Sequence, residues 1–89
     1  MATLFKVGHA SGLEVEVKDD LDVLQELVSG PIQFVYFKDG SAMMVNEEGL
    51  LRRMPLNGTA SAVAALKGHV EPLVGPCVFL SKTEMEALS

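Results

Sequence analysis

Alternating apolar and polar residues predict two strands at the start of the chain. Residues 3–7 (TLFKV) alternate weakly, whereas residues 13–17 (LEVEV) alternate strictly, with both glutamates on the face opposite the apolar side chains. Because successive side chains of a strand point to opposite faces, strict alternation is typical of a strand with one buried face. Residues 8–12 include two glycines and are predicted to turn, so that the strands form a hairpin or lie side by side.

A helical period replaces the alternation over residues 19–29, which are predicted to form the main helix. Its predicted buried face consists of Leu21, Leu24, Leu27 and Val28. Asp19 or Asp20 can accept a hydrogen bond from the first turn, and Gly30 supplies a left-handed stop before Pro31. The single apolar stripe predicts that this helix packs on one face of a sheet.

A three-stranded antiparallel meander is predicted to follow the helix. Its strands are residues 32–37, 42–46 and 50–54. The first strand is rich in β-branched and aromatic residues, and Asp39-Gly40 behind it is a strong hairpin signal. Gly49 suits the positive φ of a second tight turn, which would return the chain as the third strand.

The last third of the chain predicts two short helices and one buried strand. These are helix 60–67, strand 76–80, and one or two helical turns after Ser81, which forms a capping-box pattern with Glu84. Strands and helices do not alternate in a repeating βαβ pattern. The sequence therefore predicts a single α+β domain, with a mostly antiparallel sheet of five or six strands and its helices on one face.

The large share of apolar residues adds a question about partners. The chain of 89 residues is 48% hydrophobic, with a mean hydropathy of +0.28. A chain this short has room for one domain, so the apolar excess predicts either a dense core or a surface that a partner covers, such as a second copy in a homo-oligomer. Met43 and Met44 are neighbours on a predicted strand, so we expect one in the core and the other at an interface.

The sequence gives no sign of export or membrane insertion. It lacks the basic start and apolar run of a signal peptide, and no apolar stretch reaches the ~18 residues that span a bilayer. Its one cysteine, Cys77, excludes an internal disulfide. We therefore expect a cytoplasmic protein with no membrane partner.

The net charge of −5 is concentrated in one segment. Residues 14–26 carry six acids and one base, whereas the acids and bases elsewhere cancel. The six acids are Glu14, Glu16, Asp19, Asp20, Asp22 and Glu26. Such a surface repels phosphate backbones, which argues against nonspecific nucleic-acid binding by this face. Either it faces a basic partner, or it is a solvated strand edge followed by an acidic helix start, which the helix dipole favours.

The segment NEEGLLRRMPLN, residues 46–57, is the candidate for a ligand site. The candidate ligand-binding residues are Asn46, Arg52, Arg53 and Asn57. An arginine fork and two amides suit a phosphate or carboxylate, and backbone N–H groups at a helix start beyond Asn57 would add to an anion site. No nucleotide-binding glycine pattern is present. In the alternative, structural interpretation, the two glutamates pair with arginines on a hairpin surface, worth about 0–1 kcal/mol.

No other group of residues favours metal binding or catalysis. His9 and His69 each lack a second ligand at zinc spacing, and Cys77 lies in an apolar strand where nothing lowers its pKa. No nucleophile elbow or catalytic triad signature occurs. We therefore expect no metal, no cofactor and no enzymatic activity.

Residues 21–57 resemble the core of a family of small proteins that are encoded mainly by bacteriophages and mobile elements and whose function is not known. Members show a helix ending LQxxVxG, a strand beginning with Ile or Val, an NEEG turn and then LPxN. The matching residues are Leu24, Gln25, Val28, Gly30, Ile32, Asn46–Gly49 and Pro55–Asn57, with Met54 in place of the usual leucine. Residues 74–81 and the SKTEME tail are also similar, whereas the segment between Asn57 and Gly75 matches poorly. The resemblance implies a phage or mobile-element setting and no particular activity.

These observations predict a small non-enzymatic accessory protein of a phage or mobile element. It would bind a host or phage protein through its acidic surface or its apolar excess. The alternative is an oligomer that sequesters an anionic metabolite or a signalling nucleotide at the candidate ligand-binding residues. A structure that placed Arg52 or Arg53 in a cleft between subunits would favour the alternative.

Overall fold

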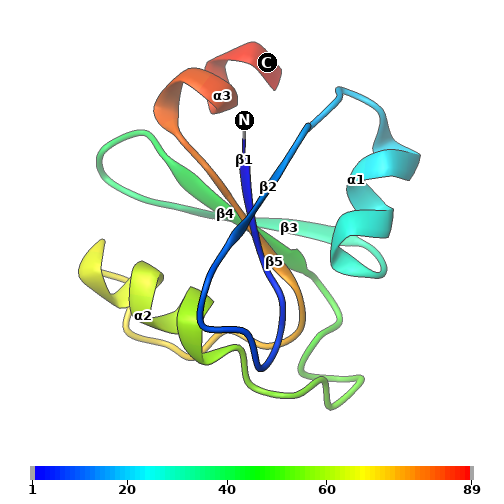
Figure 1. Ribbon diagram of the computed structural model, residues 1–89, viewed down its shortest axis with the longest axis vertical. Coiled ribbons are helices and arrows are strands. Elements are labelled where there is room, and N and C mark those ends of the chain that lie inside the picture. The colour runs from blue at the N-terminus through cyan, green and yellow to red at the C-terminus, as the bar shows by residue number, and fades with distance from the viewer. Residues whose placement is uncertain (1, 89) are drawn as a thin grey trace.

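The computed structural model describes residues 2–88 as a five-stranded antiparallel sheet with three helices (Figure 1). The strands are β1 (Ala2–Phe5), β2 (Leu13–Val15), β3 (Ile32–Tyr36), β4 (Ala42–Asn46) and β5 (Cys77–Leu80). The helices are α1 (Leu21–Val28), α2 (Gly58–Leu66) and α3 (Lys82–Leu88). The predicted α+β class and mostly antiparallel sheet are confirmed.

Strand β5 joins two hairpins into one sheet. The strand order is β2-β1-β5-β4-β3, and every neighbouring pair is antiparallel. The β3–β4 hairpin closes around Asp39-Gly40 as predicted, where Phe37 N donates to Ser41 O at 3.0 Å. Because β5 is the last strand in sequence and lies between β1 and β4, the two hairpins meet only when the C-terminal part of the chain is in place.

Residues 47–53 form turns and Met54 lies outside any strand, so the predicted third strand of the meander, residues 50–54, is wrong. The side chain of Asn46 accepts a hydrogen bond from Glu48 N at 2.8 Å, which begins a series of local turns. Within this series Arg52 N donates to Glu48 O at 2.9 Å. These local bonds use backbone groups that a strand would direct to a neighbour. The neighbour of β4 on the side away from β3 is β5, and not residues 50–54.

Helices cover both faces of the sheet, which corrects the prediction that they lie on one face (Figure 1). Helix α2 packs on one face through Ala60 and Ala64, and the main helix α1 packs with α3 on the other. Met43 lies in the core on the α2 side and Met44 in the core on the α1 side, and neither is exposed. The expectation that one methionine lies at an interface is therefore wrong, because each face of β4 is covered within the chain.

Helix α1 has most of its predicted buried face. Leu24 and Val28 are buried, whereas Leu21, in the first turn, is exposed. The helix ends at Ser29, whose φ of 65° places it in the left-handed region, so the serine takes the role predicted for Gly30. The following N–H, of Gly30, donates back to Gln25 O at 2.9 Å and completes the helix terminus.

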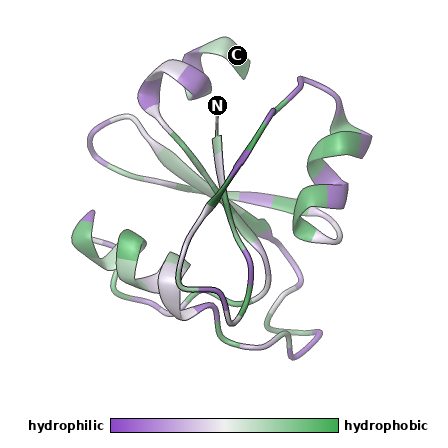
Figure 2. Ribbon diagram, viewed as in Figure 1, coloured by the Kyte–Doolittle hydropathy of each residue, from purple (hydrophilic) through white to green (hydrophobic). Residues whose placement is uncertain are grey.

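Helix α2 is apolar around most of its circumference, unlike α1 (Figure 2). Its buried alanines allow a close approach to the sheet, and Leu66 at its end is 90% exposed. The other strongly exposed aliphatic residues that follow β4 are Leu50, Leu51, Leu56 and Val70. The apolar excess of the sequence is thus divided between two buried clusters and an exposed surface around α2 and the neighbouring loops.

An ion pair fastens the β3–β4 hairpin to the end of α2. Lys67 Nζ lies 2.6 Å from Asp39 Oδ2 and 5.3 Å from the centroid of the Phe79 ring. Hydrogen bonds from Lys67 and Ser41 hold the pKa of Asp39 well below its ordinary value of 3.8. Because the folded-state pKa is lowered, the charged carboxylate stabilises the fold above the ordinary pKa, and this contribution is lost as the pH falls through the lower, folded-state value.

We predict that Lys67→Met raises the pKa of Asp39 toward 3.8, because the largest cause of its lowering is removed. Carbon NMR of the Asp39 carboxyl group during an acid titration measures this pKa directly. Lys38→Met, next to Asp39 on the same hairpin, is the matched control and should leave the titration unchanged. An Asp39 pKa that does not move in Lys67→Met would contradict the assignment.

Candidate functional site

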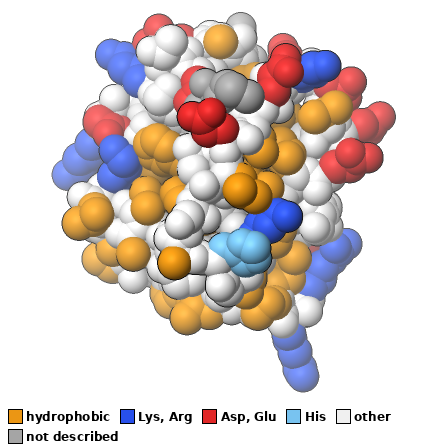
Figure 3. Space-filling view, in the orientation of Figure 1, with side chains coloured by type: hydrophobic (Ala, Val, Ile, Leu, Met, Phe, Trp, Pro, Cys, Tyr) orange, Lys and Arg blue, Asp and Glu red, His pale blue; other side chains and the backbone are white. Residues whose placement is uncertain are grey.

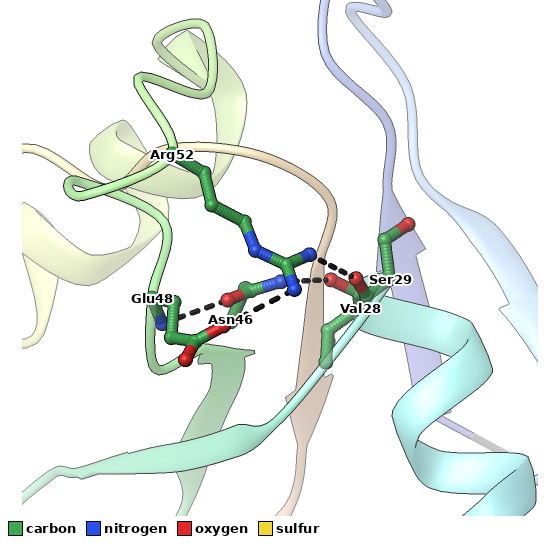
Figure 4. A network of polar contacts seen from close by, with 5 residues as sticks. All are labelled: Val28, Ser29, Asn46, Glu48 and Arg52. Atoms are coloured by element: carbon green, nitrogen blue, oxygen red, sulfur yellow. Dashed lines mark hydrogen bonds and ion pairs between the residues drawn. The ribbon is translucent and has the colours of Figure 1, made fainter.

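Asn46 and Arg52 lie against the C-terminal end of α1 (Figure 4). Asn46 Nδ2 donates to the carbonyl of Val28 at 3.0 Å, and Arg52 Nη1 donates to the carbonyl of Ser29 at 3.1 Å. The last carbonyls of a helix lack partners within it, and a cation suits the negative end of the helix dipole. The two side chains therefore hold the turn after β4 against the end of α1.

Glu48 orients Arg52 through an ion pair of the kind that the structural interpretation predicted. Its Oε1 lies 3.1 Å from Arg52 Nη2, and both side chains are about half exposed. An exposed pair of this kind contributes about 0–1 kcal/mol. The pair directs the guanidinium toward α1, where its other nitrogen meets Ser29 (Figure 4).

Gly30 leaves room for this network, and Gly49 leaves room for the side chain of Val74. A Cβ atom on Gly30 would lie 2.8 Å from Asn46 Nδ2 and 3.2 Å from Arg52 Nη1. A Cβ atom on Gly49 would lie 2.8 Å from a methyl group of Val74. The glycine that precedes β3 and the glycine of the NEEG turn are therefore required by close packing.

Asn57 forms a separate network in which its whole side chain is buried. Its Nδ2 donates to the carbonyls of Phe5 and Gly75, both at 2.8 Å, and its Oδ1 accepts from Ala60 N at 3.0 Å. Asn57 is thus the N-cap of α2 and also ties the end of β1 to the segment that enters β5. Both hydrogens of its amide are used within the protein.

The four candidate ligand-binding residues therefore do not form one group. Asn46 and Arg52 share the network at α1, and Asn57 belongs to the network at α2. Arg53 is exposed, with a left-handed φ of 53°, and its side chain makes no hydrogen bond or ion pair within residues 2–88. Ligand binding by these residues stays a prediction. The Arg53 guanidinium is free of internal bonds among residues 2–88, whereas Arg52 already contacts Ser29 and Glu48.

The acidic residues of segment 14–26 lie on the surface, where Figure 3 shows acidic side chains gathered on the side of the molecule that carries α1. Asp20 is the N-cap of α1, and its carboxylate accepts from Asp22 N at 2.9 Å. In the part of the chain that the structure describes, none of the six carboxylates forms an ion pair. Lys18 is the one base of the segment, so most of their charge is not balanced there.

An apolar groove that the sequence did not predict lies beside these acids. The groove has a volume of about 270 Å³ and is lined by Asp19, Leu24, Phe34, Tyr36, Met85 and Leu88. The rings of Phe34 and Tyr36 stack with their centroids 6.0 Å apart. Its walls come from segments far apart in sequence, so no local pattern could predict it. The spacing of two between the aromatic residues signalled only that they share a face of a strand.

The residues considered for metal or nucleophilic chemistry do not form such a site. No three His, Cys, Asp or Glu side chains among residues 2–88 are grouped to hold a metal ion. Burial raises the pKa of the Cys77 thiol to about 12, so its thiolate is scarce at neutral pH. Separately, none of the helices described has the length and apolar character needed to cross a membrane.

A protein-family model described as Domain of unknown function (DUF3846) matches residues 4–89. The chain belongs to this family. No match was found among curated proteins or among solved structures. Membership of DUF3846 agrees with the resemblance to an uncharacterised family, and it assigns no activity to the residues described above.

We predict that Asn57→Asp destabilises this DUF3846 domain by about 3 kcal/mol, because two buried carbonyls lose their donors and face a carboxylate instead. Aspartate is as good an N-cap as asparagine, so the cap of α2 is kept. The loss of stability therefore measures the two amide hydrogen bonds that join the end of β1 to the segment entering β5. Urea denaturation measures the change. Asp20→Asn, at the exposed N-cap of α1, is the matched control and should change stability by less than about 0.5 kcal/mol. Equal effects of the two variants would contradict the role given to the Asn57 amide.

We predict that native Cys77 does not react with a disulfide reagent such as dithionitrobenzoate at neutral pH. Its side chain is buried and its pKa is raised to about 12, so both access and ionisation are unfavourable. The same reagent should label Cys77 rapidly in denaturant. Rapid labelling of the folded protein would reopen the question of a nucleophilic role.

Proposed function

We propose that this DUF3846 protein is a non-enzymatic accessory protein of a bacteriophage or mobile element that binds a host or phage protein in the host cytoplasm. The phage setting rests on the sequence resemblance, and the cytoplasmic location rests on the lack of a signal-peptide pattern and of a membrane-spanning apolar stretch in the sequence. The binding function is supported by one observation, an exposed acidic surface of six carboxylates, none of which forms an ion pair within residues 2–88. In the proposal, this surface receives a partner with basic residues.

The form of the surface suits a protein partner. Asp22 and Glu26 line an open hollow on α1, and Asp19 lies at the apolar groove that holds Phe34 and Tyr36. Charge of one sign beside apolar side chains attracts a partner of opposite charge over a distance and then offers it a surface to bury. A basic segment with an apolar residue matches both features.

The alternative of a small-ligand binder has less support. Asn46, Arg52 and Asn57 already make internal hydrogen bonds, and the groove that Asn46 lines has a volume of only about 140 Å³. Pockets for drug-sized ligands usually have volumes of about 300 Å³ or more. A nucleotide would therefore need a second subunit to complete a site, and Arg53 would be the residue to contact it.

The partner can be sought by affinity capture from a bacterial lysate, with mass spectrometry to identify it and calorimetry to measure its binding. We predict that the double variant Asp19→Lys, Glu26→Lys weakens that binding by at least about tenfold, because attraction is replaced by repulsion. Asp20 is left unchanged because it caps α1.

The matched control is Glu47→Lys, Glu71→Lys, which alters two exposed acids outside segment 14–26. Each reversal adds two units of charge, so both double variants take the net charge from −5 to −1. The control should retain the affinity. A partner that binds both double variants equally well would rule out the acidic surface as its binding site.

A further inference from the structure

Strand β3 presents unpaired backbone groups along one edge of the sheet. Phe37 N donates to Ser41 O at 3.0 Å, and Glu47 N donates to Pro31 O at 2.8 Å, at the two ends of the β3–β4 ladder. Backbone groups of an antiparallel pair alternate between facing the partner strand and facing away from it. Residues 33 and 35 therefore bond to β4, and Ile32, Phe34 and Tyr36 direct their N–H and C=O groups outward.

The outward side of β3 has no neighbouring strand. Strand β3 is the last strand of the sheet, and among residues 2–88 no backbone carbonyl of another segment accepts a hydrogen bond from the N–H of Ile32, Phe34 or Tyr36. Exposed strand edges of this kind are templates for pairing with another chain.

The two edges of the sheet differ in a way that favours pairing at β3. The opposite edge strand, β2, is three residues long and carries Glu14 at its centre, with Glu16 just beyond it. Short length and charge are common protections of an edge strand. Strand β3 is five residues long, reads IQFVY, and has no charged residue and no internal proline.

We propose that β3 is the interface of a symmetric homodimer, in which β3 pairs antiparallel with β3 of a second copy about a two-fold axis at Phe34. In this register, each residue whose backbone N–H and C=O groups face outward lies opposite another such residue. Phe34 lies opposite Phe34, and Ile32 lies opposite Tyr36. Each such pair exchanges two backbone hydrogen bonds, which gives six bonds for the three pairs. The two five-stranded sheets become one continuous sheet.

The side chains of β3 also suit a second copy of the same strand. Tyr36 is 72% exposed and stacked on Phe34, so its ring is already held on the face that the two copies would share. Pairing places Tyr36 opposite Ile32 of the second copy and the two Phe34 side chains opposite each other. Aromatic and β-branched pairs across strands are favourable. On the other face, Gln33 lies opposite Val35, and no like charges meet across the five pairs.

A second copy fits this edge better than a basic partner does. The strand itself carries no carboxylate, and Asp19, in the groove beside Phe34 and Tyr36, is not part of it. When the strand is paired with a reversed copy of itself about Phe34, Ile32 lies opposite Tyr36 and Gln33 opposite Val35. A two-fold axis lets β3 of one copy pair with β3 of the other. Both β3 edges are then used, so the assembly closes at two copies. The sheet of the dimer then ends on both sides in the short, acidic β2.

Sedimentation equilibrium of the full chain at physiological ionic strength tests the proposal, because salt screens repulsion between two copies of net charge −5. We expect a mass that rises with concentration to twice the 9.5 kDa of one chain. Amide hydrogen exchange locates the interface. The N–H groups of Ile32, Phe34 and Tyr36 should exchange at least about tenfold more slowly at high than at low protein concentration, whereas those of Gln33 and Val35 should not change.

Tyr36→Pro removes one outward N–H but no bond to β4, and it should return the protein to a monomer. Tyr36→Thr removes the same ring but keeps the N–H, and it should still form the dimer, though more weakly. Amide NMR spectra of both variants verify that they fold. A monomer at millimolar concentration, a dimer without slowed exchange at Ile32, Phe34 and Tyr36, or a folded Tyr36→Pro that remains dimeric would each overturn the proposal.

Discussion

The buried amide of Asn57 is the interaction on which the arrangement of the chain most depends. It bonds to the end of β1, to the segment that enters β5 and to the first turn of α2, three parts of the chain that are distant in sequence. The carbonyls of Phe5 and Gly75 would otherwise lack these donors, at a cost of about 1–3 kcal/mol each. One polar side chain thus fixes the crossing at which the N-terminal hairpin, the central strand and α2 meet.

The polar residues that carry the family resemblance act mainly inside the protein. Asn46 completes the end of α1, Gly30 and Gly49 leave room for it and its neighbours, and Asn57 joins β1 to β5. Their chemistry would suit an anion, but their hydrogen bonds are directed to carbonyl groups of the chain itself. Membership of DUF3846 therefore informs the fold more than the function, and function is better sought on surfaces that these residues do not form.

The sequence predicted elements that depend on local patterns and missed features that depend on distant contacts. The leucine-striped helix, the Asp39-Gly40 hairpin and the capping box of Ser81 and Glu84 are all present, because their signals lie within a few residues. Residues 50–54 were assigned to a strand because Gly49 suggested a hairpin, yet the Asn46 side chain directs the following residues into turns. The sequence also did not predict that helices pack on both faces of the sheet, because α2 has no single apolar stripe that would indicate where it packs.

The β3 edge and the acidic residues of segment 14–26 are surfaces to which no internal role is assigned, and each suits a different kind of partner. The uncharged β3 edge suits the same sequence in a second copy, whereas the acidic residues suit a different, basic chain. Glu14 lies in β2, at the opposite edge of the sheet from β3, whereas Asp19 lines the groove beside Phe34 and Tyr36 of β3. In a dimer through β3, the acidic residues remote from that groove would form two acidic surfaces, and a partner with two basic sites could bind both. Because the second contact would then be intramolecular, weak attraction at each surface could give strong binding overall.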